Sequence, residues 1–143
     1  MSETVEDSRR KFADLVKLNG MSSKYIERDA ERRVLEDGVV RLGLCLDEAR
    51  GVMRAVAEDN DFVFESDIDR RIRQVLDRHA GKKGKISRQQ FEQTASILRD
   101  FSNGAMGEEE ARSHIKQVMI DSGWKPRRAG LIPTRRWYNK IET

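Results

Sequence analysis

The stretch SDIDRRIRQVLDRHAGKKGKISRQQF, residues 66 to 91, decides the fold class, because it holds two helix starts separated by a helix stop. Ser66 with Asp69, and Ser87 with Gln90, have the spacing of capping boxes. Between them, apolar residues recur every three or four positions, the period of an amphipathic helix. This apolar set consists of Ile68, Ile72, Val75 and Leu76. The stretch therefore predicts one helix that ends at the following glycine and a second that begins just after Ser87.

The same criteria, applied outward from this stretch, predict helices along most of the chain. Together with the two above, they cover about residues 7–18, 22–38, 46–59, 66–80, 88–101 and 108–122, with the second helix ending near Gly38 or continuing through VVRL, residues 39–42. Neither an alternating strand pattern nor an internal repeat is convincing in this part of the sequence. We therefore expect an all-α fold, a compact orthogonal bundle of about six helices, with residues 1–123 as one helical domain.

Length and composition indicate one folded domain without a membrane span. The chain has 143 residues, enough for one domain with a real core. Charged residues make up 37% of it, yet the apolar residues are periodic, which argues against general disorder. Its longest apolar run is only a few residues, so the sequence predicts neither a membrane span nor a secretory signal. We therefore expect a cytoplasmic protein.

The C-terminal tail, residues 124–143, differs in composition from the rest. It holds both tryptophans, both prolines and six basic residues against one acidic residue. Pro126 and Pro133 exclude a regular helix through residues 125–133, and Ala129 with Gly130 favours a turn between two basic arms. Its large apolar residues are too many for a disordered arm. We expect an irregular or hairpin-like tail that packs in part on the helical domain, with Trp124 in the core.

Two readings of the tail surface remain open. In the first, it docks a protein partner, and the chain is a non-catalytic helical interaction module. In the second, its arginines contact phosphates while aromatic rings stack on bases, and the chain binds nucleic acid. The sequence favours the first and specifies no oligomeric state. The candidate binding residues are Arg127, Arg128, Arg135, Arg136, Trp137 and Tyr138.

The segment HAGKKGKISRQQF, residues 79–91, resembles the second half of an EF-hand loop. Ile86 takes the central hydrophobic position, Gly84 the bend and Gln90 the last ligand position. The three earlier ligand positions hold a histidine, a glycine and a lysine, which do not supply the oxygen atoms that calcium requires. The resemblance implies the shape of the motif without its metal chemistry.

A second segment, AVAEDNDFVFESDIDRRIRQVLDRH at residues 55–79, resembles the helix, acidic turn and helix of TerB-like domains from tellurite-resistance and related bacterial proteins. The resemblance implies a compact helical module used in assemblies. It also makes Asp59, Asp61 and Glu65 weak candidates for metal ligands, so a divalent-metal (calcium) sensor is a lesser alternative. The other interpretation is that these acidic residues only end one helix and turn the chain.

No catalytic signature is present in the sequence. Two histidines leave few candidates for general acid–base chemistry, and GKKGK lacks the glycine spacing of a phosphate-binding loop. We therefore expect neither an enzyme nor a bound cofactor.

Overall fold

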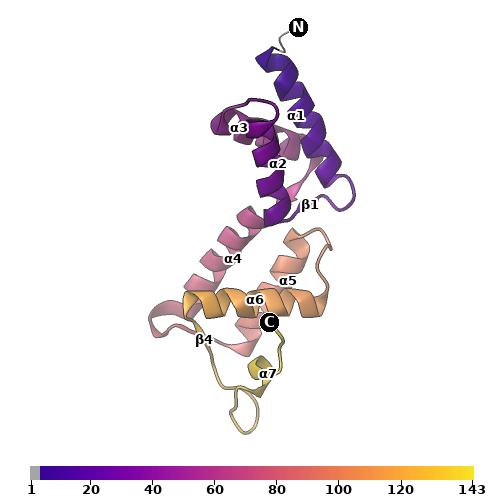
Figure 1. Ribbon diagram of the computed structural model, residues 1–143. Helices are drawn as coiled ribbons and strands as arrows, with labels where there is room; N and C mark the ends of the chain where they lie inside the picture. The colour runs from indigo at the N-terminus through magenta and orange to yellow at the C-terminus, as the bar shows by residue number, and fades with distance from the viewer. Residues whose placement is uncertain (1–3) are drawn as a thin grey trace. The chain divides into compact units, whose positions relative to one another are not determined.

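The structure is a computed structural model that describes residues 4 to 143, and these form seven α-helices and four two-residue strands (Figure 1). The all-α class predicted from the sequence is confirmed. In chain order the elements are α1 (Val5–Gly20), β1 (Tyr25–Ile26), α2 (Arg28–Val40), α3 (Leu46–Asn60), β2 (Val63–Phe64), α4 (Glu65–Ala80), a 3₁₀ turn η1 (Gly81–Lys83), β3 (Lys85–Ile86), α5 (Arg88–Phe101), α6 (Glu108–Ser122), β4 (Lys125–Pro126) and α7 (Arg136–Asn139).

One of the two predicted capping boxes is present. Ser87 Oγ accepts a hydrogen bond from the Gln90 backbone N–H at 3.1 Å, and the Gln90 side chain accepts one from the Ser87 N–H at 3.0 Å. The predicted box at Ser66 is wrong, because α4 begins one residue earlier. Ser66 Oγ instead donates to Glu31 Oε2 at 2.9 Å. A serine inside the first helical turn is free to make such a longer-range bond.

The chain divides into two compact units, residues 1–66 and 67–143, the first described from residue 4. This differs from the division expected at residue 123. Residues after 123 belong with the second unit because β4 pairs with β3, in parallel, through Lys85 with Lys125 and Ile86 with Pro126. In the first unit β1 pairs in parallel with β2 in the same manner. In each unit, a pair of short parallel strands thus joins the segment before the second helix to the segment after the third.

The two units repeat one architecture, which the sequence analysis missed. Each runs helix, short strand, helix, helix, short strand. Lys24 and Gly84, just before the first strand, both have positive φ, 58° and 65°. Asp61 and Gly123, the C-caps of α3 and α6, also match, with φ of 58° and 77°. Such agreement at left-handed positions, which few residues adopt, identifies equivalent turns.

The buried positions repeat as well. α3 buries Ala49, Met53, Val56 and Ala57, and α6 buries Ala111, Ile115, Val118 and Met119 at the same places along the helix. In the first unit α1, α2 and α3 pack on one another, and in the second α5 packs on α6. Each unit therefore has its own hydrophobic core. The core of the first is built around Phe12, Val16, Ile26, Val34, Met53 and Phe64.

Candidate protein-docking surface

The first residues of the tail are held to the loop before α5. Lys125 N–H donates to Gly84 O at 2.9 Å, and Arg127 N–H donates to Ile86 O at 2.8 Å. Pro126 lies between these two donors, at the position whose nitrogen points away from the partner strand. A proline is tolerated there because it removes no hydrogen bond from the pair. Parallel pairing therefore fixes where the tail leaves the second unit.

The tail then forms a narrow hairpin-like loop, which confirms the predicted form of the tail. Ala129 N–H donates to Thr134 O at 2.7 Å, and Thr134 N–H donates back to Ala129 O at 3.1 Å. Gly130 has φ of 105°, a conformation that glycine adopts without a steric penalty. We call residues 127–136 the tail loop. The relative exposures of Leu131 and Ile132 at its tip are 107% and 81%.

Two aromatic rings anchor the far side of the tail loop. Trp137 and Tyr138 in α7 are 6% and 8% exposed, and both pack edge-on against the buried Phe91 of α5. Trp137 Nε1 donates a hydrogen bond to Arg127 O at 3.0 Å, which ties the two ends of the loop together. Both predicted binding aromatics are therefore in the core of the second unit.

Lys116 of α6 holds α7 in place through hydrogen bonds to backbone carbonyl groups. Its ammonium group donates to Tyr138 O at 3.1 Å and to Ile141 O at 2.8 Å. It also lies 4.6 Å from the centre of the Tyr138 ring, within the range of a cation–π contact. Burial raises the pKa of the Tyr138 phenol above its usual value, because the phenolate is less well solvated there.

The four tail arginines occupy two kinds of environment. Arg127, Arg128 and Arg136 are exposed, while Arg135 is partly buried. Within residues 4–143 none of the three exposed arginines has an ion-pair partner. The Nε of Arg135 is buried and lacks a hydrogen-bond partner in the same part of the chain. The exposed charge of the loop thus comes from three guanidinium groups beside two aliphatic side chains.

Trp124 and the two residues at the loop tip are more exposed than the sequence led us to expect. Trp124, predicted in the core, is only half-buried, and its ring edge lies near Gly84. Leu131 and Ile132 are the surface residues that the sequence analysis did not single out. Their position between Gly130 and Pro133 is the signal that could have found them, because turn-forming residues on both sides favour a loop tip.

The three metal candidates have structural roles. Asp61 is the left-handed C-cap of α3, and Glu65 Oε2 accepts a hydrogen bond from the Arg28 backbone N–H at 3.0 Å, near the start of α2. Asp59 is exposed near the end of α3. From residue 4 onward, no group of three or more His, Cys, Asp or Glu side chains is arranged to hold a metal ion. The structure therefore does not bring the three together as a ligand set.

Comparisons with known protein families, with curated proteins and with solved structures found no match for this chain. Among the described helices, none is both long enough and apolar enough to cross a membrane.

Proposed function

We propose that the chain is a non-catalytic protein-interaction module of the cytoplasm, which binds its partner through the tail loop. One observation carries the proposal. Leu131 and Ile132 are almost fully exposed at the tip of a loop whose two ends are tied together by backbone and side-chain hydrogen bonds. Large aliphatic side chains in such a position gain free energy only when a partner covers them.

The surroundings of the tip indicate the chemistry of the partner. Exposed arginines flank it on both arms of the loop, at Arg127, Arg128 and Arg136. Arginine is among the residues that are enriched at energetically important interface positions. A shallow apolar pocket with acidic groups at its rim would complement this surface. Because the loop is held in place before binding, little conformational entropy would be lost.

The tail loop supports nucleic-acid binding less well. Its arginines could contact phosphates, but Trp137 and Tyr138 are buried, and stacking requires an exposed ring face. A small helical module that docks a protein also agrees with the TerB-like resemblance of residues 55–79. We therefore propose protein binding, and the experiment below distinguishes it from nucleic-acid binding.

Selection from a displayed library of random peptides tests the proposal. The full chain is the bait, and the peptides it enriches are measured against two double variants. Leu131→Ser with Ile132→Ser removes the apolar tip, whereas Val5→Ser with Leu18→Ser removes two exposed aliphatic residues of α1, at 58% and 67% exposure. The second variant is the matched control, because it changes the same kind of side chain elsewhere.

We expect enriched peptides that combine large apolar and acidic residues. Their affinity should fall at least about tenfold for the tip variant, the effect of losing roughly 1.4 kcal/mol of contact energy. The control variant should bind them as the unaltered chain does. Failure to enrich peptides, or equal losses in both variants, would contradict the proposal. Tight binding of generic oligonucleotides at low salt, abolished by alanine at the exposed tail arginines, would instead assign the loop to nucleic acid.

A further inference from the structure

The first unit has an open groove of about 440 Å³ between α2 and α3. Its floor is apolar and its rim is charged. Val39, Val40 and Leu46 line it and are 37%, 80% and 44% exposed, while Leu35 lies deeper and is half-buried. A concave surface with exposed aliphatic side chains is a favourable place for another molecule to bind.

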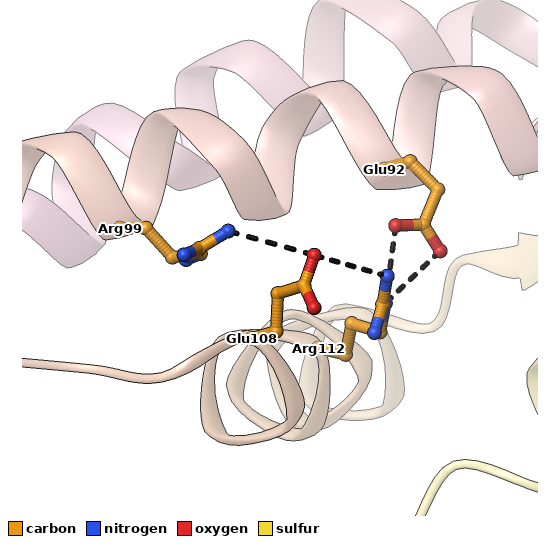
Figure 2. A network of polar contacts seen from close by, with 4 residues as sticks. All are labelled: Glu92, Arg99, Glu108 and Arg112. Carbon is orange, nitrogen blue, oxygen red and sulfur yellow. Dashed lines mark hydrogen bonds and ion pairs between the residues drawn. The ribbon is translucent and has the colours of Figure 1, made fainter.

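The equivalent position in the second unit, between α5 and α6, is bridged by ion pairs, as Figure 2 shows. The single Nε–H of Arg112 is shared between the two carboxylate oxygens of Glu92, at 3.1 Å and 3.0 Å. Glu108 Oε1 lies 3.6 Å from Arg99 Nη1 and 3.9 Å from Arg112 Nη2. The four side chains therefore form one network of ion pairs. The network links α5 to α6 across the position where the first unit has its groove.

Because the two units share one architecture, each residue of the network has a counterpart at the same helix position in the first unit. Counted from the helix starts, the network residues Glu92, Arg99, Glu108 and Arg112 correspond to Arg32, Val39, Leu46 and Arg50 in the first unit. All four of these counterparts line the groove. The architecture therefore accepts charged residues here, so the fold itself does not require the exposed valine and leucine.

The rim indicates which partner would complement the groove. Arg32 and Arg50 stand at its edges, and neither has an ion-pair partner within the described part of the chain. With Arg28, the groove is lined by three arginines against two glutamates, Glu31 and Glu36, which gives the lining a formal net charge of +1. The rim thus attracts carboxylates. The exposed apolar residues of the tail loop, in contrast, are flanked by arginines, so the tail loop of a second copy does not match.

We propose that this groove docks an amphipathic helix of a protein partner. The apolar face of the helix lies over Val39 and Leu46, and acidic residues beside that face pair with Arg32 and Arg50. Helices that bind in grooves use such a pattern of spaced apolar anchors with charged flanks. The groove lies in the first unit and binds a helix, whereas the tail loop lies in the second unit and inserts into an apolar pocket of its partner. The proposal therefore goes beyond the function proposed above.

Methyl NMR of the full chain tests the proposal with two synthetic amphipathic peptides. Both carry the same leucine face, but one has glutamate on its flanks and the other has lysine. The double variant Val39→Arg with Leu46→Glu gives the groove the residues of Arg99 and Glu108, the pair that bridges the second unit. Leu18→Glu, at an exposed position of α1 that does not line the groove, is the matched control.

The glutamate peptide should shift the methyl resonances of Val39, Val40 and Leu46. Its affinity should fall at least about tenfold in the double variant and stay unchanged in Leu18→Glu, and the lysine peptide should bind at least about tenfold more weakly. Amide spectra show whether the double variant keeps its fold. Failure of both peptides to bind, equal binding of the two, or binding that persists in the folded double variant would overturn the proposal.

Shifts at the groove that appear with protein concentration alone, without peptide, would identify a second copy as the occupant and would also overturn it. The tail loop is unaltered in these variants. Peptides selected on the tail loop should therefore bind the double variant normally, which separates failure of this proposal from failure of the proposed function.

Discussion

At the residue scale, Trp137 decides whether the tail loop has a fixed position. Its ring is buried against Phe91, and its indole N–H bonds to Arg127 O. We expect Trp137→Ala to reduce the free energy of unfolding by about 3–5 kcal/mol, because a large buried ring and a hydrogen bond are both lost. The measurement is the urea midpoint followed by circular dichroism.

Leu131→Ala is the control for this substitution. It truncates a fully exposed side chain in the same loop and should change stability by less than about 0.5 kcal/mol. Equal effects of the two substitutions would show that Trp137 is not an anchor.

Tyr138 gives a second prediction at this scale, on pH dependence. Its pKa is raised from the ordinary 10.0 because burial disfavours the phenolate. The folded state therefore holds this proton more tightly than the unfolded state. The resulting stability is fully present below the unfolded pKa and is lost as pH rises through the folded pKa. Above pH of about 10, the stability of the unaltered chain should fall more steeply than that of Tyr138→Phe.

The comparison uses denaturant midpoints at matched pH values between about 9 and 11.5, a range that spans the tyrosine pKa. Identical pH slopes for the two proteins would mean that the phenol is not buried in the folded state.

At the element scale, the start of α5 depends on a capping box that α2 lacks. Ser87 Oγ binds the Gln90 N–H, whereas Glu27 at the equivalent N-cap makes no side-chain cap bond. We expect Ser87→Ala to reduce the free energy of unfolding by about 1 kcal/mol, since one backbone donor loses its partner. Glu27→Ala should cost less than about 0.5 kcal/mol. Thermal melts of both variants measure the difference, and a larger loss for Glu27→Ala would refute it.

Most of the helices were predictable because their signals are local. The exception is the helix expected from about residue 22, which begins only at Arg28 because Tyr25 and Ile26 form β1. The Ser87 box and the stop at Gly123 act over a few residues, and both have the expected geometry. The Ser66 box failed because its hydroxyl bonds to Glu31, which is distant in the sequence. The burial of Trp137 depends in the same way on Phe91, so no local pattern could reveal it.

At the scale of the whole molecule, the repeat escaped sequence analysis because its matching positions hold different residues. Phe12 is replaced by Ile72 and Val34 by Thr94 at equivalent buried positions. What repeats is the burial pattern and the left-handed turns, which any residues of suitable size and conformation satisfy. The exposed groove of the first unit could not be predicted either, since it is recognisable only beside its bridged counterpart.

Alanine substitutions at two glycines of the first unit test whether each unit has a core of its own. A Cβ at Gly38 would lie 2.7 Å from the buried ring of Phe12, whereas one at Gly51 would meet no atom within 4 Å. Gly38→Ala should therefore cost about 1–3 kcal/mol by overpacking. Gly51→Ala should stabilise by about 0.5–1 kcal/mol, because alanine favours the helix.

Hydrogen exchange locates these effects. Because each unit has its own core, Gly38→Ala should reduce amide protection in the first unit while the second unit keeps its protection. Uniform loss of protection along the chain would contradict two separate cores. Equal signs for the two glycine substitutions would contradict the packing of Phe12 on α2.

The most direct test of the central claim, that the tail loop binds a protein, is photocrosslinking from its tip. Ile132→p-benzoylphenylalanine is placed in the full chain in cells of the source organism, with Leu18→p-benzoylphenylalanine as the exposed control. We predict a discrete crosslinked protein from position 132 that is absent from position 18 and is lost when Arg127, Arg128 and Arg136 become alanine. Crosslinks to nucleic acid alone, or identical protein crosslinks from both positions, would contradict the claim.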